Sequence, residues 1–241
     1  MRWISRWFRS PTAPRVAITV LPIGQRHGTD NHLPLEQALA VLEERGLTAT
    51  WGVASCVRDF RLAGSLVASR CPHELAFVLG RADIASEVAT FGEFSRVARR
   101  VALPLRCLIA TGAGVHPSLL SQWEVEAVVP VGLSVEPSRT GSLRALTWGV
   151  WEAPVTDRLA TPISATEFAG LESRLQLAVS QSMRMHLLWQ VGPHSLRPDW
   201  RYVCKLLDQV AEFHQRGWLK VETAGSAAEQ LSRQATPRVA G

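Results

Sequence analysis

Short apolar segments that suit β-strands alternate with segments of helical periodicity along most of this chain, and no other feature narrows the choice of fold as far. The strand-like segments are residues 15–21, 47–54, 74–79, 105–110, 125–131, 143–151, 184–190 and 218–221. The helical segments are residues 33–45, 58–70, 91–101, 117–123, 166–182, 199–216 and 224–233. This alternation predicts a parallel sheet covered by helices. The chain has roughly seven or eight such units. Within the α/β class, this number favours an irregular (β/α) barrel of about seven strands over a doubly wound sheet.

Three residues indicate where helices begin and end. Gly46 and Gly217 directly follow helical segments, so we expect them to form C-terminal caps. Thr166 is the predicted N-cap of the helix that follows it. Because barrels of this class carry their functional residues in the loops after the strands, we expect the site at the carboxyl ends of the strands.

The chain has 241 residues, of which 46% are hydrophobic, and this is enough to bury a full core. Disordered chains and disulfide scaffolds are thereby excluded. We predict a single barrel domain at residues 15–233, a basic and aromatic tail at residues 1–14 and a short tail at residues 234–241. No apolar run reaches the roughly 18 residues that a membrane helix needs.

The chain is basic, with a formal net charge of +5, and every basic residue except Lys205 and Lys220 is an arginine. We interpret most of these arginines as a solvated surface, and since no nucleic-acid motif is present we predict no nucleic-acid partner. In residues 1–14 they alternate with aromatic residues, which suits peripheral contact with a membrane or a protein partner. The four cysteines lack CxxC spacing, so we expect no structural zinc site. Since the sequence shows no export signal, we expect reduced thiols in a cytoplasmic protein.

Three stretches together resemble the polysaccharide deacetylase family, also known as the NodB-homology domain or carbohydrate esterase family 4. LEQALAVLEERGLTATWGV, at residues 35–53, is similar to the family's first helix and second strand. CPHELAFVLGRADIA, at residues 71–85, is similar to the segment that opens with His-Glu and carries two metal-binding histidines. Residues 185–231 resemble the family's ending, in which an apolar strand, a long helix and a closing strand and helix follow one another.

The resemblance implies an irregular (β/α) barrel and a metal-dependent hydrolase that removes N- or O-acetyl groups from glycans. In such enzymes two histidines and one aspartate bind a divalent metal. A second aspartate acts as base on the metal-bound water, and a histidine near the last strands acts as acid.

This chain departs from the family pattern where the chemistry is expected. The family's T-F-D-D is replaced by Thr19, Val20, Leu21 and Pro22, and neither of the last two side chains can bind a metal or accept a proton. In the second motif the chain keeps the opening residues His73 and Glu74. The two metal-binding positions that follow them hold Val78 and Ala82.

The two later motifs are equally altered. The family's R-x-P-x-G corresponds to residues 109–114, where the glycine alone remains. In the last motif the expected histidine is replaced by Gly192, although Pro193 and His194 follow it. A zinc-type site needs about three N, O or S donors that converge on one point. The sequence therefore predicts a barrel that has kept its scaffold and lost the family's metal site, with no cofactor.

Some residues could still act at the barrel mouth. His27, Asp30 and His32 lie in the loop after the first strand and offer donors for a relocated divalent metal such as zinc, or else form a solvated loop. His194 and Asp30 are the candidate catalytic residues, His194 as a general acid or a hydrogen-bond partner of a glycan. The predicted ligand pocket consists of His27, Asp30, His32, Trp51, Trp189, Gln190 and His194.

For the tryptophans and the remaining histidines, a structural role is the simpler alternative to ligand binding. Tryptophans near the ends of strands suit stacking on sugar rings or, alternatively, packing in the core; they are Trp51, Trp148, Trp151 and Trp189. The other histidines are expected to have local or structural roles; they are His73, His116, His186 and His214.

These observations leave three hypotheses. The first is a divergent deacetylase-like barrel that lacks metal-dependent deacetylase activity and binds glycans or acts in their metabolism. The second is an active hydrolase or deacetylase with a site rebuilt from His27, Asp30, His32 and His194. The third is a scaffold or peripheral membrane protein that uses residues 1–14.

Overall fold

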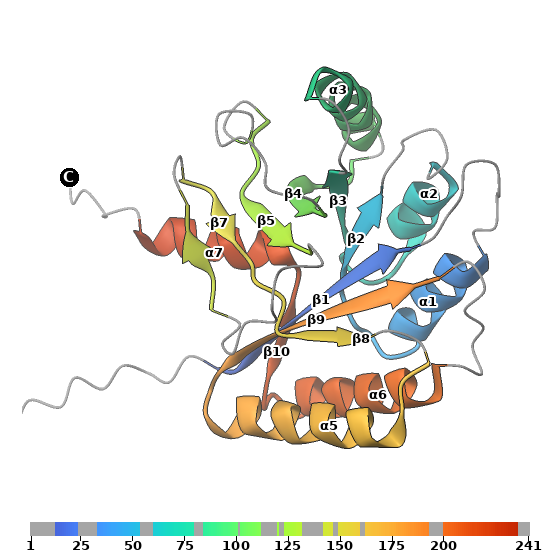
Figure 1. The fold of residues 1–241 in the computed structure, drawn as a ribbon, viewed down its shortest axis with the longest axis vertical. Helices are drawn as coiled ribbons and strands as arrows, with labels where there is room; N and C mark the ends of the chain where they lie inside the picture. Colours follow the sequence, from blue (N-terminus) through green and yellow to red (C-terminus); the bar gives the residue numbers. More distant parts are fainter. Residues whose placement is uncertain are drawn as a thin grey trace, which may run out of the picture.

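The strands of this chain form one curled sheet that makes an open barrel (Figure 1). The computed structural model describes residues 13–23, 33–53, 60–79, 84–100, 102–111, 120, 123–131, 142–146, 149–159, 162–192 and 200–235. The sheet has ten strands in the order β6-β7-β5-β4-β3-β2-β1-β9-β8, and β10 pairs with β1 off this path. The strands are β1 (Arg15–Pro22), β2 (Thr50–Val53), β3 (Glu74–Leu79), β4 (Leu105–Ala110), β5 (Ala127–Pro130), β6 (Arg144–Ala145), β7 (Trp151–Glu152), β8 (Asp157–Leu159), β9 (Arg184–Val191) and β10 (Lys220–Glu222).

Side chains alternate between the two faces of this sheet, and both faces are apolar. On the outer face, residues such as Val20 and Trp51 join a large core cluster with the helices. On the inner face, Leu21, Ile109 and Leu188 belong to a second, smaller cluster that fills the barrel. A parallel sheet that is covered on both faces has apolar residues at nearly every position of its strands.

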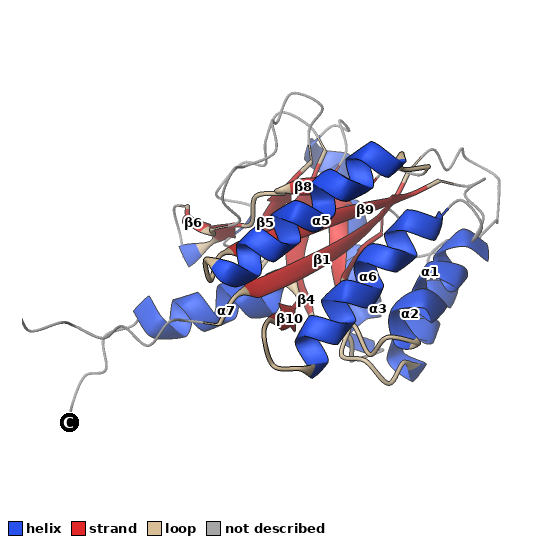
Figure 2. Ribbon diagram, turned by 90° about the horizontal axis from the view of Figure 1, so that it is seen from below, coloured by secondary structure: helices blue, strands red, loops and turns tan. Residues whose placement is uncertain are grey.

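In the part of the chain that the structure describes, five helices cover the outer face (Figure 2). They are α1 (Leu33–Glu43), α2 (Phe60–Ala68), α3 (Ile84–Arg100), α5 (Ala165–Ser180) and α6 (Arg201–Gln215). In α1 the buried residues Leu35, Ala38, Leu39 and Leu42 recur at helical spacing, so one apolar stripe faces the sheet. Helices α5 and α6 lie side by side, and α5 contacts β9.

The last helix, α7 (Ala224–Ala235), has a different position because it contacts β1, β4 and β5. Its residues Ala224 and Ala228 are buried in the inner cluster. Strand β10, directly before it, pairs with the start of β1, where Arg15 lies opposite Lys220. Strand β10 and helix α7 therefore cover the barrel at the amino ends of the central strands.

Most expected elements are present, and the two glycine caps are confirmed. Gly46 and Gly217 have φ angles of +64° and +71°, in the left-handed region that favours glycine. The predicted N-cap was wrong, because Ser164 and not Thr166 caps α5. The Ser164 hydroxyl accepts a hydrogen bond from the Glu167 N–H, and the Glu167 carboxylate accepts one from the Ser164 N–H.

The predicted strand at residues 143–151 was also wrong. Two short strands, β6 and β7, form an antiparallel pair there, and Gly149 between them has a φ of +75°. Strand β8 was not expected, and α3 starts at residue 84 instead of 91. The expected helix at residues 117–123 and the two predicted tails lie almost entirely outside the described residues. Within the described part of the chain, none of the helices has the length and apolar character required to cross a bilayer.

Candidate functional site

The carboxyl end of β1 lies at the mouth of the barrel and carries Leu21 and Pro22. Leu21 is only 4% exposed and belongs to the inner cluster, whereas Pro22 is half-buried. Val78, near the end of β3, packs against the same inner cluster. The ends of β1 and β3 that face the barrel interior are therefore occupied by aliphatic side chains.

These aliphatic side chains converge on Gly52 of β2. A Cβ atom placed on Gly52 would lie 2.8 Å from Ile109 Cδ1, 3.0 Å from Leu21 Cδ1 and 3.1 Å from Val78 Cγ2. Real Cβ contacts are almost never as short as the first of these distances. Gly52 is thus a glycine because three side chains from three other strands fill the space that its own side chain would need.

Gln190 is the predicted pocket residue that lies beside this aliphatic group. In the parallel pairing of β1 and β9 it is the register partner of Leu21. It is half-buried, near the carboxyl end of β9, and shares its face of the strand with the inner residue Leu188. Its carboxamide offers one acceptor oxygen and two N–H donors at the barrel mouth.

Trp51 and Trp189 do not offer faces for a sugar ring, which corrects their assignment to the predicted pocket. Both are 0% exposed and point outward into the core between sheet and helices. Trp51 packs edge-on against His73, and Trp189 packs edge-on against Trp200. They lie on the outer face of the sheet and pack in the core, which was the alternative to stacking on a sugar ring.

A buried pair of polar residues, Thr19 and His186, lies below the mouth. Thr19 Oγ1 is 2.8 Å from His186 Nε2, and both residues are almost completely buried. Burial lowers the pKa of His186 to about 4, against the opposing effect of the backbone groups of Ala153 and Pro154. His186 is therefore a neutral structural residue near pH 7, as the sequence indicated.

A second buried polar group, centred on Glu74, lies at the start of β3. The Glu74 carboxylate accepts hydrogen bonds from the Thr50 hydroxyl at 2.9 Å, the Thr223 hydroxyl at 2.6 Å and the Gly225 N–H at 2.8 Å. Thr50 Oγ1 in turn accepts a hydrogen bond from the Ala224 N–H. Burial raises the pKa of Glu74, although these hydrogen bonds favour the charged form.

The Glu74 group ties β2 and β3 to the first turn of α7, where the N–H groups have no partners within the helix. A carboxylate at this position is also favoured by the helix dipole. The neighbouring His73 has a local role, as expected, because its Nδ1 accepts a hydrogen bond from the Ala49 N–H. Burial lowers the pKa of His73 to about 4. Sequence reasoning missed this network, since its members are far apart along the chain.

Solved structures with the same arrangement of strands and helices were found by comparison. A protein from Mycobacterium smegmatis that is assigned as a polysaccharide deacetylase superposes with a TM-score of 0.65 at 14% identity, over 92% of each chain. The chain has the polysaccharide-deacetylase fold. The peptidoglycan deacetylase PdaC from Bacillus subtilis has a TM-score of 0.50 at 11% identity, over 93% of this chain and 94% of the other. Comparison with protein families and with curated proteins gives no match.

The match in fold confirms the resemblance read from the sequence, but the described residues do not fit the metal of the polysaccharide deacetylases. Leu21, Pro22 and Val78 stand at positions that the resemblance gives to catalytic or metal-binding groups, and their side chains have no donor atoms. Thr19, on the same strand as Leu21, is already bonded to His186. In the part of the chain that the structure describes, no three His, Cys, Asp or Glu side chains could together hold a metal ion.

Several predicted site residues of this polysaccharide-deacetylase fold lie outside the described residues. They are His27, Asp30, His32 and His194, and with them Ala82, His116 and Trp148. The rebuilt site around the first-strand loop therefore stays a prediction. Trp151 is described, and its indole N–H donates to the Ser232 hydroxyl at 2.8 Å.

Proposed function

We propose that this protein binds a glycan at the mouth of its barrel and does not carry out the metal-dependent deacetylation that its fold is known for. The fold supports the choice of ligand class, since the similar structures are those of a polysaccharide deacetylase and a peptidoglycan deacetylase. Fold alone does not define a function, so the proposal depends on the residues at the strand ends.

One observation carries the proposal, and it is the aliphatic packing around Gly52. Leu21, Val78 and Ile109 occupy the space at the strand ends where the family resemblance places metal ligands and a base. Carbon side chains in that space offer no ligand to a metal ion and no base for a metal-bound water. A divalent ion prefers oxygen, nitrogen or sulfur ligands, and a desolvated ion among methyl groups is strongly disfavoured.

The polar groups proposed to contact the glycan are Gln190 and, as a prediction from the sequence, residues of the loops that follow β1 and β9. Gln190 stands beside Leu21 and can exchange hydrogen bonds with sugar hydroxyls. His27, Asp30, His32 and His194 follow β1 and β9 in the sequence, so their loops start from the mouth. An apolar floor with a few polar groups around it is the usual composition of a site for a small molecule.

The first experiment measures bound metal and acetate release in the same preparation. The protein is purified without a histidine tag, offered zinc, cobalt and nickel in turn, and examined by elemental analysis. Acetate release is then assayed with acetylated chitooligosaccharides and acetylated xylooligosaccharides. We expect metal near background and no acetate release above the uncatalysed rate. Near-stoichiometric metal together with acetate release would overturn the proposal and favour the rebuilt site of His27, Asp30 and His32.

The second experiment measures binding of the same oligosaccharides by isothermal titration calorimetry. The variant Gln190→Ala removes the carboxamide of Gln190 from the mouth. We expect it to weaken binding about tenfold, which corresponds to a loss of about 1.4 kcal/mol of binding free energy. The matched control is Gln176→Ala, because Gln176 is exposed on α5. Absence of binding by the wild-type protein, or equal weakening in both variants, contradicts the proposal.

A further inference from the structure

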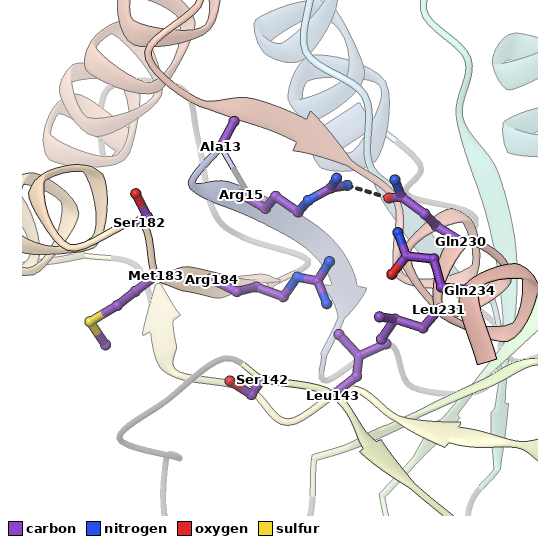
Figure 3. A pocket seen from close by; sticks show the side chains of 10 residues that line it. All are labelled: Ala13, Arg15, Ser142, Leu143, Ser182, Met183, Arg184, Gln230, Leu231 and Gln234. Carbon is purple, nitrogen blue, oxygen red and sulfur yellow. Dashed lines mark hydrogen bonds between the residues drawn. The ribbon is translucent and has the colours of Figure 1, made fainter. Parts of the chain in front are cut away.

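A pocket of about 380 Å³ lies at the opposite end of the same two central strands (Figure 3). Its walls come from the first residues of β1 and β9, the segment before β6, and α7. Arg15 and Arg184 begin β1 and β9 and are register partners in the sheet. Figure 3 shows their guanidinium groups pointing the same way, toward the face of α7 that carries Gln230 and Gln234.

The charges around this pocket do not balance. Both arginines bind one carboxylate, that of Glu222, at 2.5 Å for Arg15 and 2.7 Å for Arg184. The side chain of Glu222 is 4% exposed and those of the arginines are 17% and 14% exposed, so water screens the three groups poorly. Two guanidinium groups and one carboxylate leave one positive charge, and none of the described residues that line the pocket is acidic.

The two arginines also have unused hydrogen-bonding capacity. Arg184 Nε is buried and has no hydrogen-bond partner among the described residues. A guanidinium has five N–H donors, and on Arg15 the structure pairs one nitrogen, Nη1, with both Glu222 and Gln230. Burial lowers the pKa of Arg184, the nearby carboxylate of Glu222 raises it, and Arg15 lowers it again. A second negative group would therefore stabilise the pair of arginines.

We infer that this pocket binds an oxyanion, a carboxylate or a phosphate, that is carried by a small polar molecule. Arginine pairs favour such groups because planar N–H donors match two oxygens at once. The volume is in the range of small-molecule sites, so the anion would be one substituent of a larger ligand. Three uncharged polar residues of the lining, Ser142, Ser182 and Gln234, can hold the remainder of that molecule. This inference does not depend on the proposed function, since the glycan site lies at the other end of the strands.

The experiment follows the arginine Nε–H signals of 15N-labelled protein by NMR. Sodium acetate and sodium phosphate are titrated separately, with sodium chloride added to keep ionic strength constant. We expect the Arg184 Nε–H signal, assigned by its loss in Arg184→Lys, to shift in a saturable way. Saturation with acetate alone assigns a carboxylate, and saturation with phosphate alone assigns a phosphate. Saturation with both supports the general oxyanion site.

A pair of charge variants tests whether the binding is specific to the pocket. Gln234→Glu places a carboxylate at the pocket wall on an exposed residue of α7, so the fold is retained. It supplies the missing negative charge from within the chain, and we expect the added anion to bind about tenfold more weakly. Gln215→Glu makes the same change in net charge on an exposed residue at the end of α6 that does not line the pocket. Its affinity should equal that of the wild type.

Two results would overturn the inference. One is a wild-type protein whose arginine signals respond to acetate and phosphate no more than to chloride at equal ionic strength. The other is equal weakening by Gln234→Glu and Gln215→Glu, which would show a general effect of net charge. The Arg184→Lys variant adds a further check, because it keeps the charge and loses the planar donor group. Unchanged affinity in that variant would exclude the guanidinium as the binding group.

Discussion

Glu74 accepts a hydrogen bond of 2.8 Å from the N–H of Gly225, a residue 151 positions later in the chain. The bond links the start of β3 to the first turn of α7, and it is one of three that end on this buried carboxylate. The donors around Glu74 point at both of its carboxylate oxygens, so the network requires each of these two atoms to accept hydrogen bonds.

Replacing this carboxylate by an amide should destabilise the fold. In Glu74→Gln one acceptor oxygen becomes an N–H₂ group that faces a donor, and a buried mismatch of this kind costs about 2 kcal/mol. We expect the free energy of unfolding, measured by urea denaturation, to fall by about that amount. Glu93→Gln on the exposed side of α3 is the control and should be neutral. Equal stability of the two variants would contradict the assigned role of Glu74.

Gly225 should tolerate no side chain. A Cβ atom at this position would lie 2.7 Å from Glu74 Oε2 and 3.1 Å from Arg106 Cβ. Gly225→Ala is expected to lower the free energy of unfolding by about 1–3 kcal/mol, although alanine is the better helix former. Gly92→Ala on α3 is the matched control, because its Cβ would meet nothing within 4 Å. That variant should be stabilised by up to about 1 kcal/mol, and thermal melting of both variants measures the difference.

Leu21 should accept an apolar replacement and reject a charged one. In Leu21→Asp a carboxylate would be buried among methyl groups without a partner, at a cost of at least about 3 kcal/mol. Leu21→Met keeps the volume and should cost less than about 1.5 kcal/mol. Chemical denaturation compares the two variants. If Leu21→Asp retained wild-type stability, the space around Gly52 would be open to solvent and the proposed function would lose its main support.

Acid should destabilise the protein through two histidines that are buried in its described part. His73 and His186 have pKa values lowered by burial to about 4, against 6.5 for an unperturbed histidine. The unfolded chain therefore binds more protons between these values, and stability that is complete above about pH 6.5 is lost as the pH falls toward 4. Each histidine contributes on the order of 3 kcal/mol to this loss. Glu74 acts with the opposite sign, because burial raises its pKa.

The variant His186→Gln isolates one of these contributions. Its free energy of unfolding should be lower than that of the wild type at pH 7.5, since the contact with Thr19 is changed. Between pH 6.5 and 4, however, its stability should decline less steeply than that of the wild type. Urea denaturation at a series of pH values measures both slopes. Parallel slopes would show that His186 is protonated alike in the folded and unfolded chain.

The sequence was sufficient for the class of fold, because strand and helix periods differ and alternate clearly. It was insufficient around β6 and β7, where strands of two residues are too short to show a period. The placement of Trp51 and Trp189 failed for a related reason. Both faces of this sheet are apolar, so the alternation along β2 and β9 does not reveal which face is the interior.

The Glu74 network and the cluster of Arg15, Arg184 and Glu222 could not be predicted from the sequence either. Glu74 was noted as the second residue of a family motif, but its partners Thr223 and Gly225 are common residue types near the end of the chain. Arg15, Arg184 and Glu222 likewise come from three separate strands, and nothing in the local pattern of any one strand indicates that they meet. Such contacts depend on the pairing of β1 with β9 and β10, which is a property of the whole sheet.

That pairing also determines when the protein can fold during its synthesis. Strand β1 leaves the ribosome before its neighbours β9 and β10, which come much later in the sequence, with Arg15 opposite Arg184 and Lys220. Contacts between residues so far apart in sequence slow folding, because a long loop must close before they form. The edge of β1 that pairs with β9 and β10 therefore stays unpaired until both of these later strands have been translated. During that interval the unpaired edge of β1 is open to aggregation.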